Sequence, residues 1–87
     1  MVKTHVHQNI GTCSKSVTIE YDDKTREILN IKFIGGCPGN IQGVSKLCVG
    51  RKLDEVYEML YGIKCGMRGT SCPNELAKGI KEVIEEL

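Results

Sequence analysis

The spacing of apolar residues in this chain changes at Gly35-Gly36, and this change limits the possible folds most strongly. Before the two glycines, apolar and polar residues alternate over residues 15–21 and 27–34, as in strands with one buried face. The apolar face holds Val17, Ile19 and Tyr21 in the first run and Leu29, Ile31 and Phe33 in the second. A short polar turn joins the two runs, so they predict an antiparallel hairpin. Residues 3–8 predict a short edge strand, which would make a sheet of two or three strands.

After Gly36 the apolar residues recur at helical spacing. They form stripes within residues 41–48, 53–60 and 76–87, and the last helix is predicted to run from about Pro73 to the end. The first stripe consists of Ile41, Val44, Leu47 and Cys48, and the last consists of Leu76, Ile80, Val83, Ile84 and Leu87. Strands followed by helices predict an α+β fold, in which three helices pack on one face of an antiparallel sheet. We expect residues 1–87 to form a single domain with a modest core.

Composition excludes several classes of function. The net charge is +1, with acids and bases mixed along the chain, so we expect neither a nucleic-acid partner nor a membrane partner. The N-terminal residues lack the apolar segment of a signal peptide, and no stretch approaches the roughly 20 apolar residues of a membrane span. We therefore expect a cytoplasmic protein.

Five cysteines are many for a chain of 87 residues. In a reducing compartment they indicate metal or redox chemistry rather than structural disulfides. The two prolines each follow a cysteine, in Cys37-Pro38 and Cys72-Pro73, and each pair stands where a helix is predicted to begin. The positive end of a helix dipole favours a thiolate, which can bind a metal or attack an electrophile.

Four of the cysteines are predicted to converge. Cys13 precedes the first hairpin strand and Cys37 follows the second, so antiparallel pairing makes them neighbours. Cys65 and Cys72 bracket a loop before the last helix, and they join the others if this helix begins at the same end of the sheet. Four thiolates in tetrahedral geometry suit zinc or an iron–sulfur cluster. Cys48 lies on an apolar helical stripe, so we expect it in the core.

Three further residues have simpler interpretations. His5 and His7 share one face of the predicted edge strand, at a spacing that could hold a metal. We expect them instead to be solvent-facing side chains near a frayed terminus. Glu75 is the third residue after Cys72, where a capping carboxylate would stand.

The segment Thr70-Ser71-Cys72-Pro73-Asn74 resembles the signature of the TSCPD domain family, with Asn74 in place of the aspartate. The resemblance extends over nearly the whole chain through residues 11–14, 35–40 and 65–66. It matches small stand-alone members with four cysteines, and these are Cys13, Cys37, Cys65 and Cys72 here. The family also supplies a C-terminal module to cobalamin-dependent ribonucleotide reductases, so the resemblance implies a reductase or another redox enzyme as partner.

Residues 31–37 and 50–56 are similar to iron–sulfur scaffold proteins of the IscU/NifU type. This similarity implies an IscU/NifU-like fold in which Cys13, Cys37 and Cys72 occupy the places of the scaffold cysteines. Lys15 stands where the scaffold family has a ligand-site aspartate, and Ser71 where many members have a histidine. Cys65 is then the candidate fourth ligand.

These observations leave three functions open. The first is a small cytosolic zinc-binding domain, acting as an accessory module of a ribonucleotide reductase. The second is an iron–sulfur scaffold or carrier, and the third is a thiol redox partner of the reductase. We do not expect enzyme activity from this chain alone, because 87 residues cannot supply the barrel and cofactor site of ribonucleotide reduction.

Overall fold

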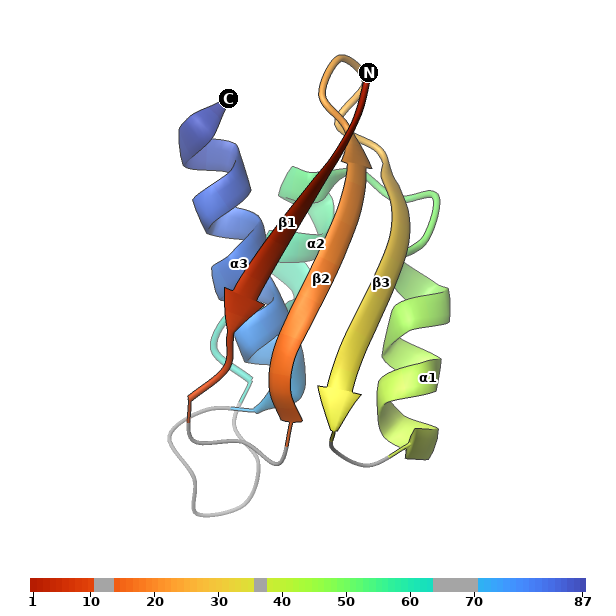
Figure 1. Cartoon of the computed structure of the whole chain (residues 1–87), viewed down its shortest axis with the longest axis vertical. Helices are drawn as coiled ribbons and strands as arrows, with labels where there is room; N and C mark the ends of the chain where they lie inside the picture. Colours follow the sequence, from red (N-terminus) through yellow and green to blue (C-terminus); the bar gives the residue numbers. More distant parts are fainter. Residues whose placement is uncertain (11–13, 36–37, 64–70) are drawn as a thin grey trace.

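The sheet has three antiparallel strands. A computed structural model of the chain describes residues 1–10, 14–35, 38–63 and 71–87, and only the backbone over residues 38–41. The strands are β1 (Val2–Gln8), β2 (Ser14–Asp22) and β3 (Ile28–Gly35), in the order β1-β2-β3. The predicted edge strand and the predicted hairpin are both confirmed (Figure 1).

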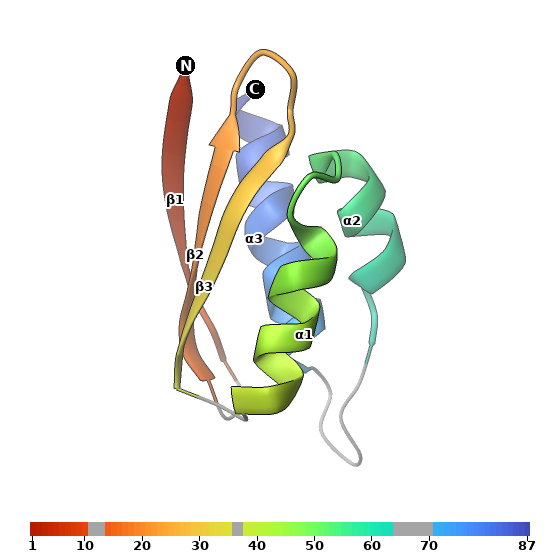
Figure 2. The ribbon, with the colours of Figure 1, turned by 90° about the vertical axis from the view of Figure 1, so that its right-hand side faces the viewer.

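Three helices follow the strands: α1 (Pro38–Cys48), α2 (Leu53–Leu60) and α3 (Cys72–Glu86). All three lie on one face of the sheet (Figure 2). Helix α1 packs beside β3, α3 crosses β1 and β2, and α2 packs against α3. The predicted α+β fold is therefore confirmed.

The core lies between the sheet and the helices. Strand β2 contributes Val17, Ile19 and Tyr21, the alternating residues that the sequence predicted to be buried. The other apolar members of the buried cluster come from β3 and the three helices: Ile28, Ile31, Cys48, Leu53, Val56, Leu76, Ile80 and Val83. A helix layer with an apolar stripe thus covers the apolar face of the sheet.

Three predicted core positions are wrong, and one of them is Leu87, at the end of the predicted stripe of residues 76–87, which is 44% exposed. Leu29 was expected on the buried face of β3, but the strand register shifts opposite Glu20 and Tyr21, so Ile28 is fully buried instead. Leu47 was expected on the buried stripe of its helix, but it is 69% exposed. Helix α1 contacts the sheet mainly along β3, so its buried stripe is narrow.

Several helix and strand ends lie together at one end of the molecule. Both views place the end of β1, the start of β2, the end of β3 and the starts of α1 and α3 there (Figures 1 and 2). The two chain termini lie at the opposite end. Ser14 and Gly35 are Cα partners, which brings the start of β2 beside the end of β3.

Candidate functional site

Helix α3 begins at Cys72, next to the predicted start at about Pro73. Ser71 is the N-cap: its backbone is extended, and its hydroxyl oxygen accepts the backbone N–H of Asn74 at 3.2 Å. The same hydroxyl donates to the carbonyl oxygen of Ile63 at 2.6 Å. Cys72 is therefore the first residue of the helix, on a firmly held N-terminus, and Pro73 stands in the first turn as predicted.

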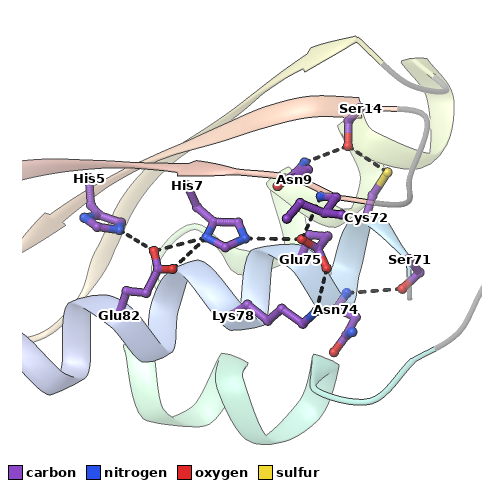
Figure 3. Close-up of polar contacts among 11 residues, drawn as sticks. His5, His7, Asn9, Ser14, Ser71, Cys72, Asn74, Glu75, Lys78 and Glu82 are labelled. Atoms are coloured by element: carbon purple, nitrogen blue, oxygen red, sulfur yellow. Dashed lines mark hydrogen bonds and ion pairs between the residues drawn. The ribbon is translucent and has the colours of Figure 1, made fainter. Parts of the chain in front are cut away.

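The sulfur of Cys72 points into a buried polar contact. Its Sγ lies 3.1 Å from Oγ of Ser14, and the two residues are only 7% and 3% exposed. Nδ2 of Asn9 donates to the same Ser14 oxygen at 2.7 Å (Figure 3). A thiol, a hydroxyl and an amide from three different parts of the chain thus meet at the start of α3.

This contact joins three element ends. Ser14 follows Cys13 directly in the chain and is the Cα partner of Gly35 at the end of β3. Because its hydroxyl also contacts Cys72, the start of β2, the end of β3 and the start of α3 lie together. The condition that the sequence left open, that the last helix begins at this end of the sheet, is therefore met.

Cys13, Cys37 and Cys65, the other predicted ligands, lie outside the residues that the structure describes. The four-thiolate site therefore stays a prediction. Within the described ranges, no group of three or more histidine, cysteine, aspartate and glutamate side chains is arranged to hold a metal ion.

A second polar cluster joins β1 to α3. Nε2 of His5 lies 2.8 Å from Glu82 Oε1, and Nδ1 of His7 lies 3.0 Å from both oxygens of the same carboxylate (Figure 3). The side chain of His7 is 11% exposed and that of His5 is 21% exposed. The expectation of two solvent-facing histidines is therefore wrong, because α3 covers this part of the edge strand.

Glu75 is the buried member of this cluster. Its Oε1 lies 3.2 Å from Nε2 of His7 and accepts the backbone N–H of Ile10 at 3.1 Å, while Oε2 pairs with Nζ of Lys78 at 3.0 Å. The predicted capping role is therefore wrong: this carboxylate holds the end of β1 rather than the start of its own helix. A neutral imidazole has one N–H, so only a doubly protonated His7 ring donates to both flanking carboxylates.

The spacing of residues in the sequence contains a signal for this cluster. Glu75, Gly79 and Glu82 lie on one face of α3, at helical spacings of four and three residues. His5 and His7 are the Cα partners of Ile19 and Val17, so they face the helices with the core residues of β2. Asn9 and Ser14 had no comparable signal beyond the position of Ser14 beside Cys13.

The cluster changes the ionisation of its outer carboxylate. Partial burial raises the pKa of Glu82, but hydrogen bonds from His5 and His7 outweigh it and leave the pKa below its ordinary value. The charged form of Glu82 is therefore favoured in the folded protein.

Cys48 lies in the core, as predicted. It is 3% exposed, and burial raises the pKa of its thiol to about 11. It borders an apolar cavity of about 190 Å³ between α1 and α2, lined by Val44, Leu47, Cys48, Arg51, Met59 and Leu60. A neutral, covered thiol is poorly suited to metal binding or to redox exchange.

The comparison with protein families identifies the chain. The family model of the TSCPD domain matches residues 1–84. The chain belongs to the TSCPD domain family. Comparison with curated proteins and with solved structures gives no match. The similarity to IscU/NifU scaffolds therefore stays a prediction.

The structure explains the asparagine in the TSCPD signature. Oδ1 of Asn74 accepts the backbone N–H of Gly62 at 2.7 Å, which ties the start of α3 to the end of α2. An aspartate oxygen could accept the same hydrogen, so Asn74 retains the acceptor that this contact needs. The fifth signature residue thus helps to fix the start of α3.

No helix in the described part of the chain is both long enough and apolar enough to span a membrane.

Proposed function

We propose that this TSCPD domain is a cytosolic zinc-binding module, with zinc held by Cys13, Cys37, Cys65 and Cys72. One observation carries the proposal: the buried sulfur of Cys72 lies at the start of α3, against Ser14 at the end of the hairpin. The remaining three ligands are assigned from the sequence.

The surroundings of Cys72 suit a metal-bound thiolate. Cys72 is the first residue of α3, at the positive end of the helix dipole, which attracts the negative charge of a metal-bound thiolate. The Ser14 hydroxyl is a hydrogen-bond donor within reach of that sulfur. Zinc would supply a tetrahedral cross-link between loop ends, and such a link stabilises a small domain directly.

Metal analysis tests this function. Protein purified anaerobically is expected to contain stoichiometric zinc, with neither iron nor sulfide. Single Cys→Ser changes at the four predicted ligands are expected to lower zinc retention, whereas Cys48→Ser is expected to leave it unchanged because Cys48 lies in the core. Iron and sulfide in the wild-type protein would establish the iron–sulfur alternative instead.

The third function, thiol redox exchange, gives different results. It requires accessible thiols that form reversible disulfides. We expect the ligand cysteines to resist alkylation until a chelator is added, because a metal occupies them. Rapid alkylation of the untreated protein, together with an absence of bound metal, would contradict the zinc module and favour redox exchange.

We further propose that the module acts through a protein partner, a ribonucleotide reductase or another redox enzyme. The TSCPD family supports this assignment, because a TSCPD module forms the C-terminal part of cobalamin-dependent ribonucleotide reductases. The zinc-loaded protein is expected to bind such a reductase in a direct titration, and Cys72→Ser is expected to bind more weakly. Equal binding by the metal-free Cys72→Ser protein would show that the zinc site is not needed for the partner.

A further inference from the structure

Asn9, Ser14 and Cys72 form a chain of hydrogen bonds. Asn9 donates through Nδ2 to Oγ of Ser14, and this oxygen lies 3.1 Å from Sγ of Cys72. Asn9 is itself held at the end of β1, because its backbone N–H donates to the carbonyl of Lys15 at 2.9 Å. The amide, the hydroxyl and the sulfur therefore lie in series across the end of the sheet (Figure 3).

The direction of the second bond follows from the chemistry of a bound thiolate. A metal-bound cysteine sulfur carries no proton, so it can only accept a hydrogen bond. Ser14 must then be the donor toward Cys72, and its oxygen is left to accept from the amide of Asn9. This arrangement requires Nδ2 of Asn9 to face Ser14, as it does in the structure.

The other amide atom of Asn9 supports this orientation. Oδ1 of Asn9 is buried and has no hydrogen-bond partner among the described residues. A buried, unpaired carbonyl oxygen costs free energy, so its presence calls for an explanation. The bond from Nδ2 to the Ser14 oxygen holds the amide in this orientation despite that cost.

We propose that Ser14 is a positioning residue that donates a hydrogen bond to the metal-bound sulfur of Cys72, and that Asn9 fixes its direction. This inference rests on the proposed zinc site. Both Ser14 and Cys72 are almost completely buried, where low polarity strengthens a hydrogen bond to a charged acceptor. The bond withdraws electron density from the sulfur.

The effect can be measured on the metal itself. In protein loaded with cobalt(II), the sulfur-to-metal charge-transfer band of Ser14→Ala is expected at longer wavelength than in the wild type, because the sulfur is more electron-rich. Zinc affinity, measured by competition with a chelator, is expected to fall about 10- to 100-fold, as is common when a partner of a metal ligand is removed. Ser14→Thr, which keeps the hydroxyl, is expected to restore both properties.

Ser16→Ala is the matched control, because it makes the same chemical change two residues along β2. Asn9→Ala is expected to shift the band in the same direction by less, and this variant decides the question if Ser14→Ala does not fold. A Ser14→Ala protein whose band and zinc affinity equal those of Ser16→Ala overturns this inference and leaves the zinc site standing. A wild-type protein that binds no metal overturns both.

Discussion

At the scale of single residues, Glu75 combines deep burial with a negative charge. Its side chain is 2% exposed and contacts His7, the backbone of Ile10 and Lys78. A buried charge is tolerated only when it is paired and hydrogen-bonded, and these partners satisfy that condition from both layers. Glu75 therefore links α3 to the end of β1, close to the proposed zinc site.

Glu75→Gln tests this link. The amide has the same shape but no charge, and its NH₂ group would face the ammonium of Lys78 or a ring N–H of His7. We expect the free energy of unfolding to fall by about 2–3 kcal/mol. Glu85→Gln, an exposed change on the same helix, is expected to alter it by less than about 0.5 kcal/mol. Chemical denaturation of both variants measures the difference, and equal stabilities would contradict the role of Glu75.

At the scale of elements, the contact between β1 and α3 depends on a glycine. A Cβ atom at Gly79 would lie 2.9 Å from Cβ of His7 and 3.2 Å from Cδ1 of Ile19. The first contact is with an atom attached directly to the strand backbone, so the strand itself would have to move. The close approach of helix and strand places His7 between Glu75 and Glu82.

Gly79→Ala is therefore expected to destabilise the protein even though alanine favours a helix. We expect a net loss of about 1–3 kcal/mol, because inserting a methyl group overpacks this interface. Gly43→Ala is the matched control on α1, where no atom lies within 4 Å of the added Cβ. It should stabilise the protein by about 0.5–1 kcal/mol. Thermal unfolding compares the two variants. A stabilising effect of Gly79→Ala would show that β1 can move away from α3 at little cost in free energy.

The same interface should make stability depend on pH. Partial burial is outweighed by the hydrogen bonds from His5 and His7, so the pKa of Glu82 in the folded protein is below its ordinary value of 4.5. The unfolded chain therefore takes up a proton first as pH falls, and the contribution of Glu82 is present at neutral pH and lost in acid.

Glu82→Gln removes the pH-dependent contribution of the Glu82 carboxylate to the free energy of unfolding. The difference in unfolding free energy between the wild type and Glu82→Gln is expected to shrink as the pH falls from about 5 to about 3. Urea titrations across that range measure it, with Glu85→Gln as a control that follows the wild type. A difference that stays constant with pH would rule out the contribution of the Glu82 carboxylate.

At the scale of the whole molecule, the proposed zinc would stabilise the end of the domain that lies opposite the chain termini. The apolar core lies between the helices and the sheet, and the chain termini lie at the end of the molecule opposite the start of α3, where Cys72 stands. A domain of this size buries a limited core, so a metal that joins loop ends contributes a large share of its stability.

Removal of zinc should therefore lower the melting temperature of the wild-type protein. Zinc present at a thousandfold excess over its Kd stabilises the folded state by about 4 kcal/mol. For a domain of this size that corresponds to roughly 15 °C or more. Calorimetry with and without a chelator measures the change, and Cys72→Ser is expected to show little response. An unchanged melting temperature of the wild-type protein after addition of the chelator would contradict a structural role for zinc.

Much of the fold could be predicted because local patterns agree with it. Alternation in β2 placed Val17, Ile19 and Tyr21 in the core, and Pro73 marked the first turn of α3. The alternation of apolar residues wrongly predicted that Leu29 is buried, because a register shift in the strand pair buries Ile28 instead. Such a shift depends on how two strands pair, and neither strand reveals it alone.

The sequence by itself determined the order of elements, the helix starts and the separate place of Cys48, because these follow from short-range spacing and backbone preferences. Only the tertiary structure decided the partners of His7, Glu75 and Ser14. These contacts join residues far apart in the chain, and they depend on the close packing of α3 on β1 and β2. The same packing buries the sulfur of Cys72 beside the hydroxyl group of Ser14.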